Sequence, residues 1–191
     1  MMKRIALFAS GNGTNVQRIC EYFKDSPEIQ PVLILSDNAK AFVLKRAENL
    51  GVPALWISRN QLQDASFIMP ILAKYAIDFI VLAGFLRLVP AYLIEAYPDK
   101  ILNIHPALLP KYGGKGMYGS HVHEAVVKAK ETESGISIHY VSAKYDEGDI
   151  VFQAKCSIEP NDTAEDVAKK IHVLEYTYFP QEIEKCILEI K

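Results

Sequence analysis

Apolar positions along the chain follow two periods, one typical of strands and one typical of helices, and the two alternate. Continuous apolar runs, which predict strands buried on both faces, lie at residues 5–9, 31–35, 53–57, 79–83 and 101–104. After the first run, Val16, Ile19 and Phe23 recur at helical spacing, which predicts an amphipathic helix. This alternation indicates an α/β protein with a mostly parallel, Rossmann-like sheet and helices on both faces.

Glycine and proline mark where the other predicted helices end or bend. Apolar residues recur at helical spacing from Ala39 to Leu50, and Gly51 suits the end of that helix. A later helical pattern contains Pro70, so we expect a kink there or a helix that begins late. Pro180 should likewise kink or restart the long C-terminal helix.

The order of elements changes in the last third of the chain. A helix is predicted over residues 119–130, followed by strands at 136–141 and 150–158. The loop between these strands, 142–149, is too short for the crossover that a parallel pair needs, so we expect an antiparallel strand pair near the C-terminal end. No linker or internal repeat is evident, and we predict a single domain over residues 1–191.

Composition and charge exclude several classes of protein. Apolar residues make up 50% of the 191 residues and charged ones 23%, an ordinary balance for a globular domain. A formal net charge of -2 provides no field for a polyanion, so we expect no nucleic-acid partner. The three cysteines are far apart, and no apolar stretch approaches the ~20 residues of a membrane span. We therefore expect a cytoplasmic protein without a disulfide framework.

The segment from Ser10 to Asn15, which joins the first strand to the first helix, predicts an anion site. Gly11 and Gly13 let the backbone approach an anion, and the helix N-terminus behind them offers unpaired N–H groups. A dinucleotide site is one rival, because Asp37 lies where a ribose-binding acid would fall, but Val16 replaces the third glycine of that motif. A tight turn without a ligand also stays open. We favour a single phosphate bound here.

A second candidate site lies in the run Asn103-Ile104-His105-Pro106, where a strand enters a rigid loop. In an extended segment, Asn103 and His105 point to the same face, which brings together a neutral amide donor and a titratable imidazole. The pair suits proton transfer at a carbonyl, although an Asn in a turn beside a structural His fits equally well. A carboxylate of the loop 145–149 near His105 would favour the imidazolium, and the residues alone do not choose among its three acids.

Two further segments carry possible binding chemistry. The stretch 82–90 leaves a strand at Gly84 and then presents apolar groups and Arg87, which suits a pocket for a flat aromatic ligand or ordinary core packing. His121 and His123 form an H-x-H pair, but this spacing on a helix points the two imidazoles to different faces, and no cysteine or carboxylate set completes a zinc site. We therefore expect no metal.

Three segments that carry this chemistry also share a likeness to one family. They read Ala9-Ser10-Gly11-Asn12-Gly13-Thr14-Asn15, Leu82-Ala83-Gly84-Phe85-Leu86-Arg87 and Asn103-Ile104-His105-Pro106-Ala107-Leu108-Leu109-Pro110-Lys111. They closely resemble the folate-dependent formyltransferase family, and within it the phosphoribosylglycinamide formyltransferases. The resemblance extends in colinear order over essentially the whole chain, as far as Glu175 in the last helix. Asp149 departs from it, since many relatives carry proline there.

The resemblance implies a reaction and a role for each matched residue. It implies transfer of a formyl group from 10-formyltetrahydrofolate, a co-substrate, to the amine of glycinamide ribonucleotide in purine biosynthesis. His105 would be the proton donor, Asn103 would bind the formyl oxygen, and Asp146 would pair with His105 and raise its pKa. The residues on the phosphate and ribose would be Gly11, Asn12, Gly13, Thr14 and Glu175. Those on the folate would be Arg59, Leu86, Arg87, Leu88, Val89, Asn103, Val141, Tyr145 and Asp146.

Other functions stay open beside this one. The nearest rivals in chemistry are a formyltransferase that acts on methionyl-tRNA or a nucleotide sugar, and a formyl-folate hydrolase. Work on transfer RNA would need an added basic domain, for which 191 residues with a net charge of -2 leave no room. A non-catalytic nucleotide-binding module would use the segment 10–15 but would leave Asn103, His105 and Asp146 without a role. As partners we expect small-molecule substrates, no nucleic acid and no membrane, and we expect a monomer or homodimer.

Overall fold

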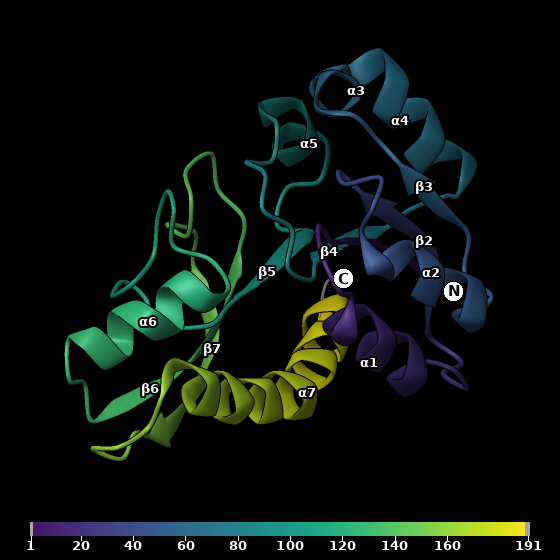
Figure 1. The fold of residues 1–191 in the computed structure, drawn as a ribbon. Coiled ribbons are helices and arrows are strands. Elements are labelled where there is room, and N and C mark those ends of the chain that lie inside the picture. Colours follow the sequence, from purple (N-terminus) through teal and green to yellow (C-terminus); the bar gives the residue numbers. More distant parts are fainter. Residues whose placement is uncertain (1, 190–191) are drawn as a thin grey trace.

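A seven-stranded sheet runs through the middle of the computed structural model, which describes residues 2–189 (Figure 1). Its strands lie in the order β3-β2-β1-β4-β5-β6-β7. They are β1 (Lys3–Phe8), β2 (Ile29–Ser36), β3 (Ala54–Trp56), β4 (Phe79–Leu82), β5 (Ile101–His105), β6 (Glu133–Tyr140) and β7 (Ile150–Ser157). The first five strands pair in parallel, and β6 is antiparallel to both β5 and β7, which confirms the predicted sheet. The ends of the predicted domain, residues 1 and 190–191, lie outside the described residues.

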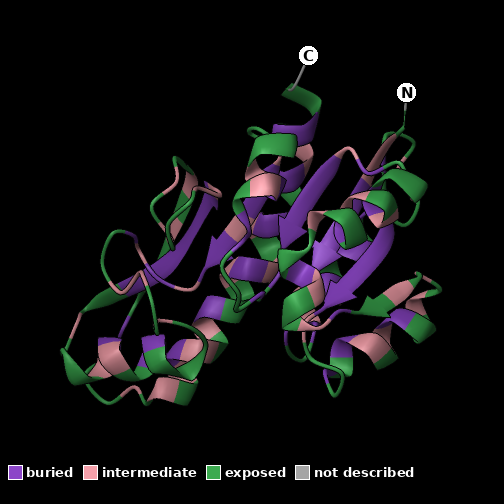
Figure 2. Cartoon of the chain, turned by 90° about the horizontal axis from the view of Figure 1, so that it is seen from above, coloured by how far each residue is buried: buried purple, intermediate pink, exposed green. Residues whose placement is uncertain are grey.

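Helices cover both faces of the sheet, as the strand–helix alternation predicted. They are α1 (Thr14–Tyr22), α2 (Phe42–Leu50), α3 (Arg59–Gln63), α4 (Ala65–Lys74), α5 (Ala91–Ala96), α6 (Ser120–Lys128) and α7 (Ala164–Glu189). Apolar residues of α1, α2, α6 and α7 pack with one face of the sheet, and those of α3, α4 and α5 pack with the other. Figure 2 shows the buried strands in the centre and exposed residues on the outer sides of the helices.

The two apolar cores share the central strand β1. Ile5 and Leu7 belong to the core under α1 and α7, whereas Ala6 and Phe8 belong to the core on the opposite face. All four side chains are almost completely buried. The continuous apolar run therefore reflects a strand covered on both sides, since successive residues of a strand point to opposite faces.

The strand order reverses direction between β1 and β4, and the loops that follow these strands are bonded to each other there. Ser10 N donates a hydrogen bond to Gly84 O at 3.0 Å, and Leu86 N donates one to Ser10 Oγ at 2.9 Å. In open α/β sheets, ligands bind outside the carboxyl ends of the strands at such a reversal. The fold therefore joins the predicted anion segment to the predicted pocket segment.

The helical segment around Pro70 differs from its prediction. It consists of two helices, α3 and α4, and the break lies at Asp64. Ser58 and Gln61 form a capping box at the start of α3, and the Asp64 side chain accepts a hydrogen bond from Ser66 N at the start of α4. Pro70 lies inside α4, so the cap at Asp64, and not the proline, sets where the second helix begins.

Two other helices were predicted incompletely. The sequence pattern did not indicate α5, which has only six residues and buries only Leu93. The long helix α7 continues through Pro180 without a restart, and Figure 1 shows it changing direction along its length. No helix in the part of the chain that the structure describes combines the length and the apolar content needed to cross a bilayer.

Gly135 lies where β6 approaches β7, and we expect Gly135→Ala to destabilise the fold. An added Cβ would lie 2.6 Å from Leu108 Cδ2 and closer still to Ala154 O, so the backbone would have to move. Overpacking of this kind costs about 1–3 kcal/mol or more. Urea unfolding followed by circular dichroism measures the loss. Gly11→Ala is the matched control, because its Cβ would meet nothing within 4 Å; equal midpoints for the two variants would contradict the prediction.

Candidate active site

The turn between β1 and α1 leaves the N-terminus of the helix open. Gly13, the N-cap residue of α1, has a left-handed φ of 76° and no side chain with which to cap the helix. A Cβ on Gly13 would lie 2.6 Å from the Cβ of Val43, so both the conformation and the space require glycine. The uncapped N–H groups and the positive end of the helix dipole suit an anion.

Two distant parts of the chain hold this turn in place. Arg46 of α2 donates to Asn12 O at 2.7 Å and to Asn12 Oδ1 at 3.0 Å. Asn15 Nδ2 donates to the buried carboxylate of Glu175 in α7 at 3.0 Å. His172 Nδ1 donates to the same carboxylate at 2.9 Å, and this hydrogen bond raises the pKa of His172 above its usual value. Asn15 therefore links the predicted phosphate-binding turn to Glu175, the predicted ribose-binding residue.

Asn103 and His105, at the end of β5, form one group with Asp146 and His139. The register of β5 and β6 pairs Asn103 with His139, and Asn103 Nδ2 lies 3.0 Å from His139 Nε2. One oxygen of Asp146 lies 3.5 Å from Asn103 Nδ2, and the other lies 3.5 Å from His105 Nδ1. Of the three acids in the loop after β6, Asp146 is therefore the one that reaches the imidazole of His105.

His105 is buried and meets an acceptor at each ring nitrogen. Its Nε2 donates to Tyr112 O at 2.7 Å, while Nδ1 faces Asp146. Burial lowers the pKa of His105, and the Asp146 carboxylate and the Tyr112 carbonyl only partly offset it. The prediction that Asp146 sets a raised pKa is therefore wrong in its net direction, because desolvation outweighs the carboxylate. Asn103 lies beside Leu82 of β4, which lies beside Phe8 of β1, so this group and the turn after β1 lie at the same edge of the sheet.

Asp146 is held as a carboxylate by the groups around it. Its backbone φ is 56°, an uncommon left-handed conformation for a residue other than glycine. Burial raises the pKa of Asp146, but the contacts with His139, with His105 and with the Gly114 N–H outweigh burial, so the pKa lies below its usual value. The Gly114 N–H donates to Oδ2 at 2.9 Å. Asp146 thus brings a fixed negative charge beside both imidazoles.

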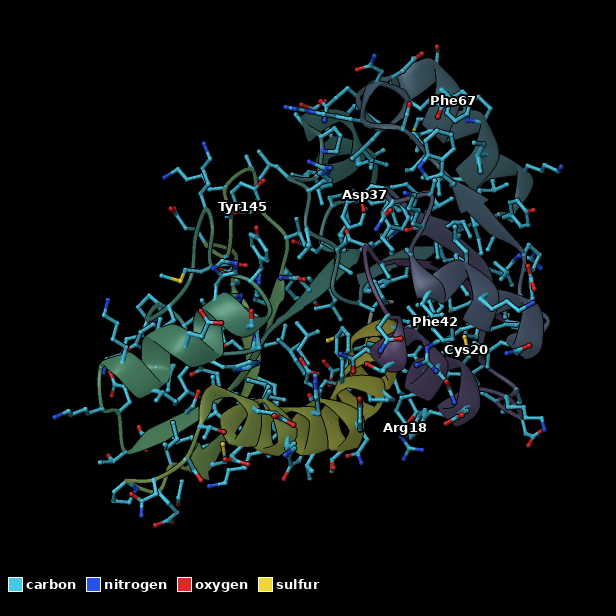
Figure 3. All side chains as sticks on the ribbon, in the orientation of Figure 1. Arg18, Cys20, Asp37, Phe42, Phe67 and Tyr145 are labelled. Carbon is cyan, nitrogen blue, oxygen red and sulfur yellow. The ribbon has the colours of Figure 1, made fainter. Side chains whose placement is uncertain are left out.

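The predicted folate-binding residues combine exposed apolar side chains with a shared apolar cluster. Leu86 and Leu88 follow β4 and are large, exposed apolar groups. Val89 is buried, and Val141 packs into the same cluster from the end of β6. Tyr145 lies exposed in the loop between β6 and β7 (Figure 3). Exposed apolar groups next to a buried polar group fit a ligand with an aromatic body.

The two arginines of the predicted folate set have different surroundings. Arg87 Nε donates to Asp37 Oδ2 at 2.6 Å, which ties the loop after β4 to the end of β2. Asp37, the acid that in the sequence could have bound the ribose of a dinucleotide, is thus already paired with Arg87. Arg59 is exposed at the first residue of α3, beyond the edge strand β3, which β2 separates from β1. A role for Arg59 stays a prediction.

The histidine pair of α6 is divided between two environments, as its spacing predicted. His121 is exposed and its ring centroid lies 5.2 Å from that of Tyr118. His123 is buried, and burial lowers its pKa. The helix therefore does not present the two imidazoles as one chelating pair.

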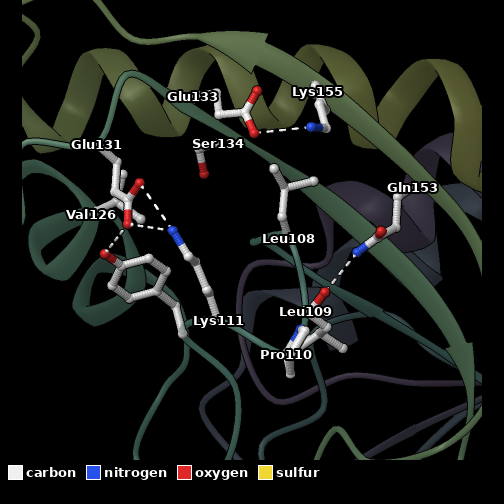
Figure 4. A pocket seen from close by; sticks show the side chains of 11 residues that line it. Leu108, Leu109, Pro110, Lys111, Val126, Glu131, Glu133, Ser134, Gln153 and Lys155 are labelled. Carbon is white, nitrogen blue, oxygen red and sulfur yellow. Dashed lines mark hydrogen bonds and ion pairs between the residues drawn. The ribbon is translucent and has the colours of Figure 1, made fainter.

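A cavity of about 290 Å³ is lined in part by Tyr112, the residue whose carbonyl contacts His105 (Figure 4). The segment 108–112 forms one wall, and two ion pairs, Lys111–Glu131 and Lys155–Glu133, line it. The buried Ser134 Oγ faces this space without a protein partner. Because its charges are paired with one another, the cavity suits ordered solvent and not a charged substrate.

Sequence reasoning missed two residues of this region. His172 lies three positions before Glu175, a spacing that places both on one face of a helix, so the pattern could have indicated it. His139 carries no such local signal, because its partner Asn103 is reached only through the register of two strands.

Comparison with known sequences points to a single family. A family model described as "Formyl transferase" matches residues 3–183. The phosphoribosylglycinamide formyltransferase of Bacillus subtilis is 34% identical over 191 residues, which cover 97% of this chain and 95% of that protein. The chloroplastic phosphoribosylglycinamide formyltransferase of Arabidopsis thaliana is 39% identical over 88% of this chain. The chain spans only 60% of that plant protein, and 13% of the trifunctional purine biosynthetic protein adenosine-3 of Drosophila pseudoobscura pseudoobscura.

Solved structures agree with this assignment. The phosphoribosylglycinamide formyltransferase of Anaplasma phagocytophilum superposes with a TM-score of 0.88 at 30% identity, covering 100% of this chain and 90% of that one. The glycinamide ribonucleotide transformylase 1 of Geobacillus kaustophilus superposes with a TM-score of 0.87 at 34% identity, covering 97% and 98%. Since fold, family model and full-length relatives agree, the chain belongs to the formyl transferase family, in the group that includes the phosphoribosylglycinamide formyltransferases.

Proposed function

We propose that this protein transfers the formyl group of 10-formyltetrahydrofolate to the amine of glycinamide ribonucleotide, a step of purine biosynthesis. The observation that carries the proposal is the group of Asn103, His105 and Asp146, which lies at the same edge of the sheet as the open N-terminus of α1, because β1, β4 and β5 are neighbouring parallel strands. An acid–base group beside an anion site suits a reaction on a phosphorylated substrate. The names of the full-length relatives support this acceptor.

The acceptor would bind at the start of α1. Its phosphate would take the N–H groups of the turn formed by Gly11, Asn12, Gly13 and Thr14, where no side chain competes as a cap. Glu175 is already positioned as a hydrogen-bond acceptor by Asn15, and a ribose hydroxyl is a donor of matching chemistry. Arg46, fixed on Asn12, adds positive charge next to this turn.

The formyl donor would bind across the loop after β4 and the loop after β6. The exposed side chains of Leu86, Leu88 and Tyr145 offer apolar surface for a flat ring system, and Val89 and Val141 support it from a shared cluster. This arrangement would bring the reactive carbonyl to Asn103 at the end of β5. When bound, the donor supplies the activated formyl group.

The residues of the site would act on charge and protons. As the amine attacks the formyl carbon, the carbonyl oxygen gains negative charge, and an N–H of Asn103 would donate to it. A donor of this kind typically lowers the barrier by about 3–4 kcal/mol. As an imidazolium, His105 would give up its Nε2–H contact with Tyr112 O and donate that proton to the leaving nitrogen. The neutral ring, with its remaining proton on Nδ1 toward Asp146, would then take a proton from the attacking nitrogen at Nε2, directly or through water. Asp146 stabilises the imidazolium form.

An assay with purified protein tests this function. We expect the ultraviolet spectrum of 10-formyltetrahydrofolate to change with loss of the formyl group only when glycinamide ribonucleotide is present. His105→Ala should lower turnover at least about a hundredfold, within the usual worth of a general acid–base catalyst. Loss of the formyl group without any acceptor would indicate a hydrolase instead, and transfer to other amines alone would contradict the proposed acceptor.

Gly13→Ala should weaken binding of the ribonucleotide, because the added Cβ would press on Val43 and deform the turn that faces the phosphate. We expect a raised KM for glycinamide ribonucleotide with a smaller effect on the KM for the folate, measured by steady-state kinetics. Gly51→Ala is the matched control, since Gly51 has a similar φ of 67° at the end of α2 and its Cβ would meet nothing within 4 Å. Equal KM values in the two variants would contradict a phosphate at Gly13.

Asp146→Asn should lower the pKa of His105 further. Burial already lowers this pKa, and the Asp146 carboxylate opposes burial, so removing the negative charge removes part of that opposition. Titration of the His105 ring resonances by NMR measures the shift, and we expect a lower midpoint in the variant. Glu147→Gln removes the neighbouring exposed carboxylate, which is paired with Lys144, and serves as the control. An unchanged or raised midpoint in Asp146→Asn would exclude the pairing.

A further inference from the structure

His139 lies at the centre of the catalytic group, yet the proposed reaction assigns it no task. It is 2% exposed, and its register partner across β5 and β6 is Asn103. Its two ring nitrogens face different groups. Nδ1 lies 2.8 Å from Tyr140 O, and Nε2 lies 3.0 Å from Asn103 Nδ2 and 3.6 Å from Asp146 Oδ1. Both ring nitrogens of this buried histidine are therefore committed to defined partners.

The Tyr140 carbonyl determines where His139 carries its proton. A carbonyl oxygen only accepts, so the contact at 2.8 Å requires a hydrogen on Nδ1. In the neutral ring the other nitrogen, Nε2, then has a free lone pair, whereas in the imidazolium it would carry a second N–H aimed at Asp146 Oδ1, 3.6 Å away. This lone pair points at Asn103 and needs a donor.

The amide of Asn103 has two orientations, and its neighbours favour one of them. With the NH2 group toward His139, one hydrogen bonds to the Nε2 lone pair at 3.0 Å. In the reversed orientation, the amide oxygen would face the Nε2 lone pair and would also lie about as close to Asp146 Oδ1 as the nitrogen does now, at 3.5 Å. Two acceptors facing an oxygen would be repulsive, so both His139 and Asp146 select the NH2 orientation.

We propose that His139 is a positioning residue that orients the Asn103 amide so that its second N–H is available to the formyl oxygen. That hydrogen is weakly held in the free protein, because its acceptor, Asp146 Oδ1, lies at the 3.5 Å limit of a hydrogen bond. The inference rests on the proposed function for its kinetic meaning, whereas the orientation of the amide is a property of the protein alone. Without His139, only the long contact with Asp146 Oδ1 would select the NH2 orientation, so the amide would also populate the orientation that presents its oxygen to the substrate.

Two amide substitutions at position 139 separate orientation from packing. The side-chain amide of glutamine reaches the place of Nε2, whereas that of asparagine reaches only the place of Nδ1. His139→Gln therefore keeps an acceptor for Asn103, and His139→Asn keeps only the donor for Tyr140 O. We expect His139→Asn to lower kcat about a hundredfold, as loss of an oxyanion donor does, and His139→Gln to stay within about tenfold of wild type. KM for both substrates should change by less than about threefold, since the amide acts on the developing charge.

A double-mutant cycle checks that the effect passes through Asn103. In an Asn103→Ala background, His139→Gln and His139→Asn should differ by less than about twofold, because the group that His139 orients is absent. Equal kcat losses in the two single variants, or the same hundredfold difference retained without Asn103, would overturn the proposal in favour of a packing role. Thermal unfolding of each variant controls for loss of fold.

Nitrogen-15 NMR of the wild-type imidazoles gives a readout that needs neither activity nor a variant. We expect His139 to show a protonated Nδ1 and an unprotonated Nε2. A signal for two protonated nitrogens, or for a proton on Nε2 alone, would overturn the proposal even if formyl transfer is observed. Conversely, the expected spectrum in a protein that fails to formylate glycinamide ribonucleotide would leave the orientation intact and reject the proposed reaction.

Discussion

The antiparallel pairing of β6 with β5 is the contact on which the candidate site depends. On its own, β5 would end in two polar side chains, Asn103 and His105, at the edge of a parallel sheet. Pairing with β6 covers this edge and places His139 opposite Asn103. The loop that follows β6 then brings Asp146 next to His105.

Desolvation sets the chemical character of this group. His105 and His139 are buried and Asp146 is partly buried, each beside a partner, because an unpaired buried charge would be strongly unfavourable. Burial lowers the pKa of His105 despite its carboxylate neighbour, while the contacts around Asp146 keep that carboxyl ionised. The free protein thus combines a fixed negative charge with an imidazole that resists protonation. In the proposed reaction, an incoming substrate would replace the Tyr112 carbonyl as the partner of Nε2.

The sequence was sufficient for the fold because the fold depends on local patterns. Apolar runs gave the buried strands, and the loop 142–149 was short enough to require an antiparallel pair. The break between α3 and α4 at Asp64 could also have been predicted, since Ser58 and Gln61 have capping-box spacing and Ser66 follows Asp64. The choice of Asp146 among three acids came only with the family resemblance. The partner of His139 and the net pKa of His105 follow from register and burial, which no local pattern contains.

The alternation of β1 between the two cores has a consequence for how accurately the site is assembled. Sliding this strand by one residue would push Phe8 into space shaped for Leu7 and leave Ala6 where Ile5 belongs, on both faces at once. Neither core could absorb that exchange at native packing density. Packing on both faces therefore fixes the position of β1 along its own strand direction. It thereby also fixes where the turn after Phe8 meets the loop that follows β4.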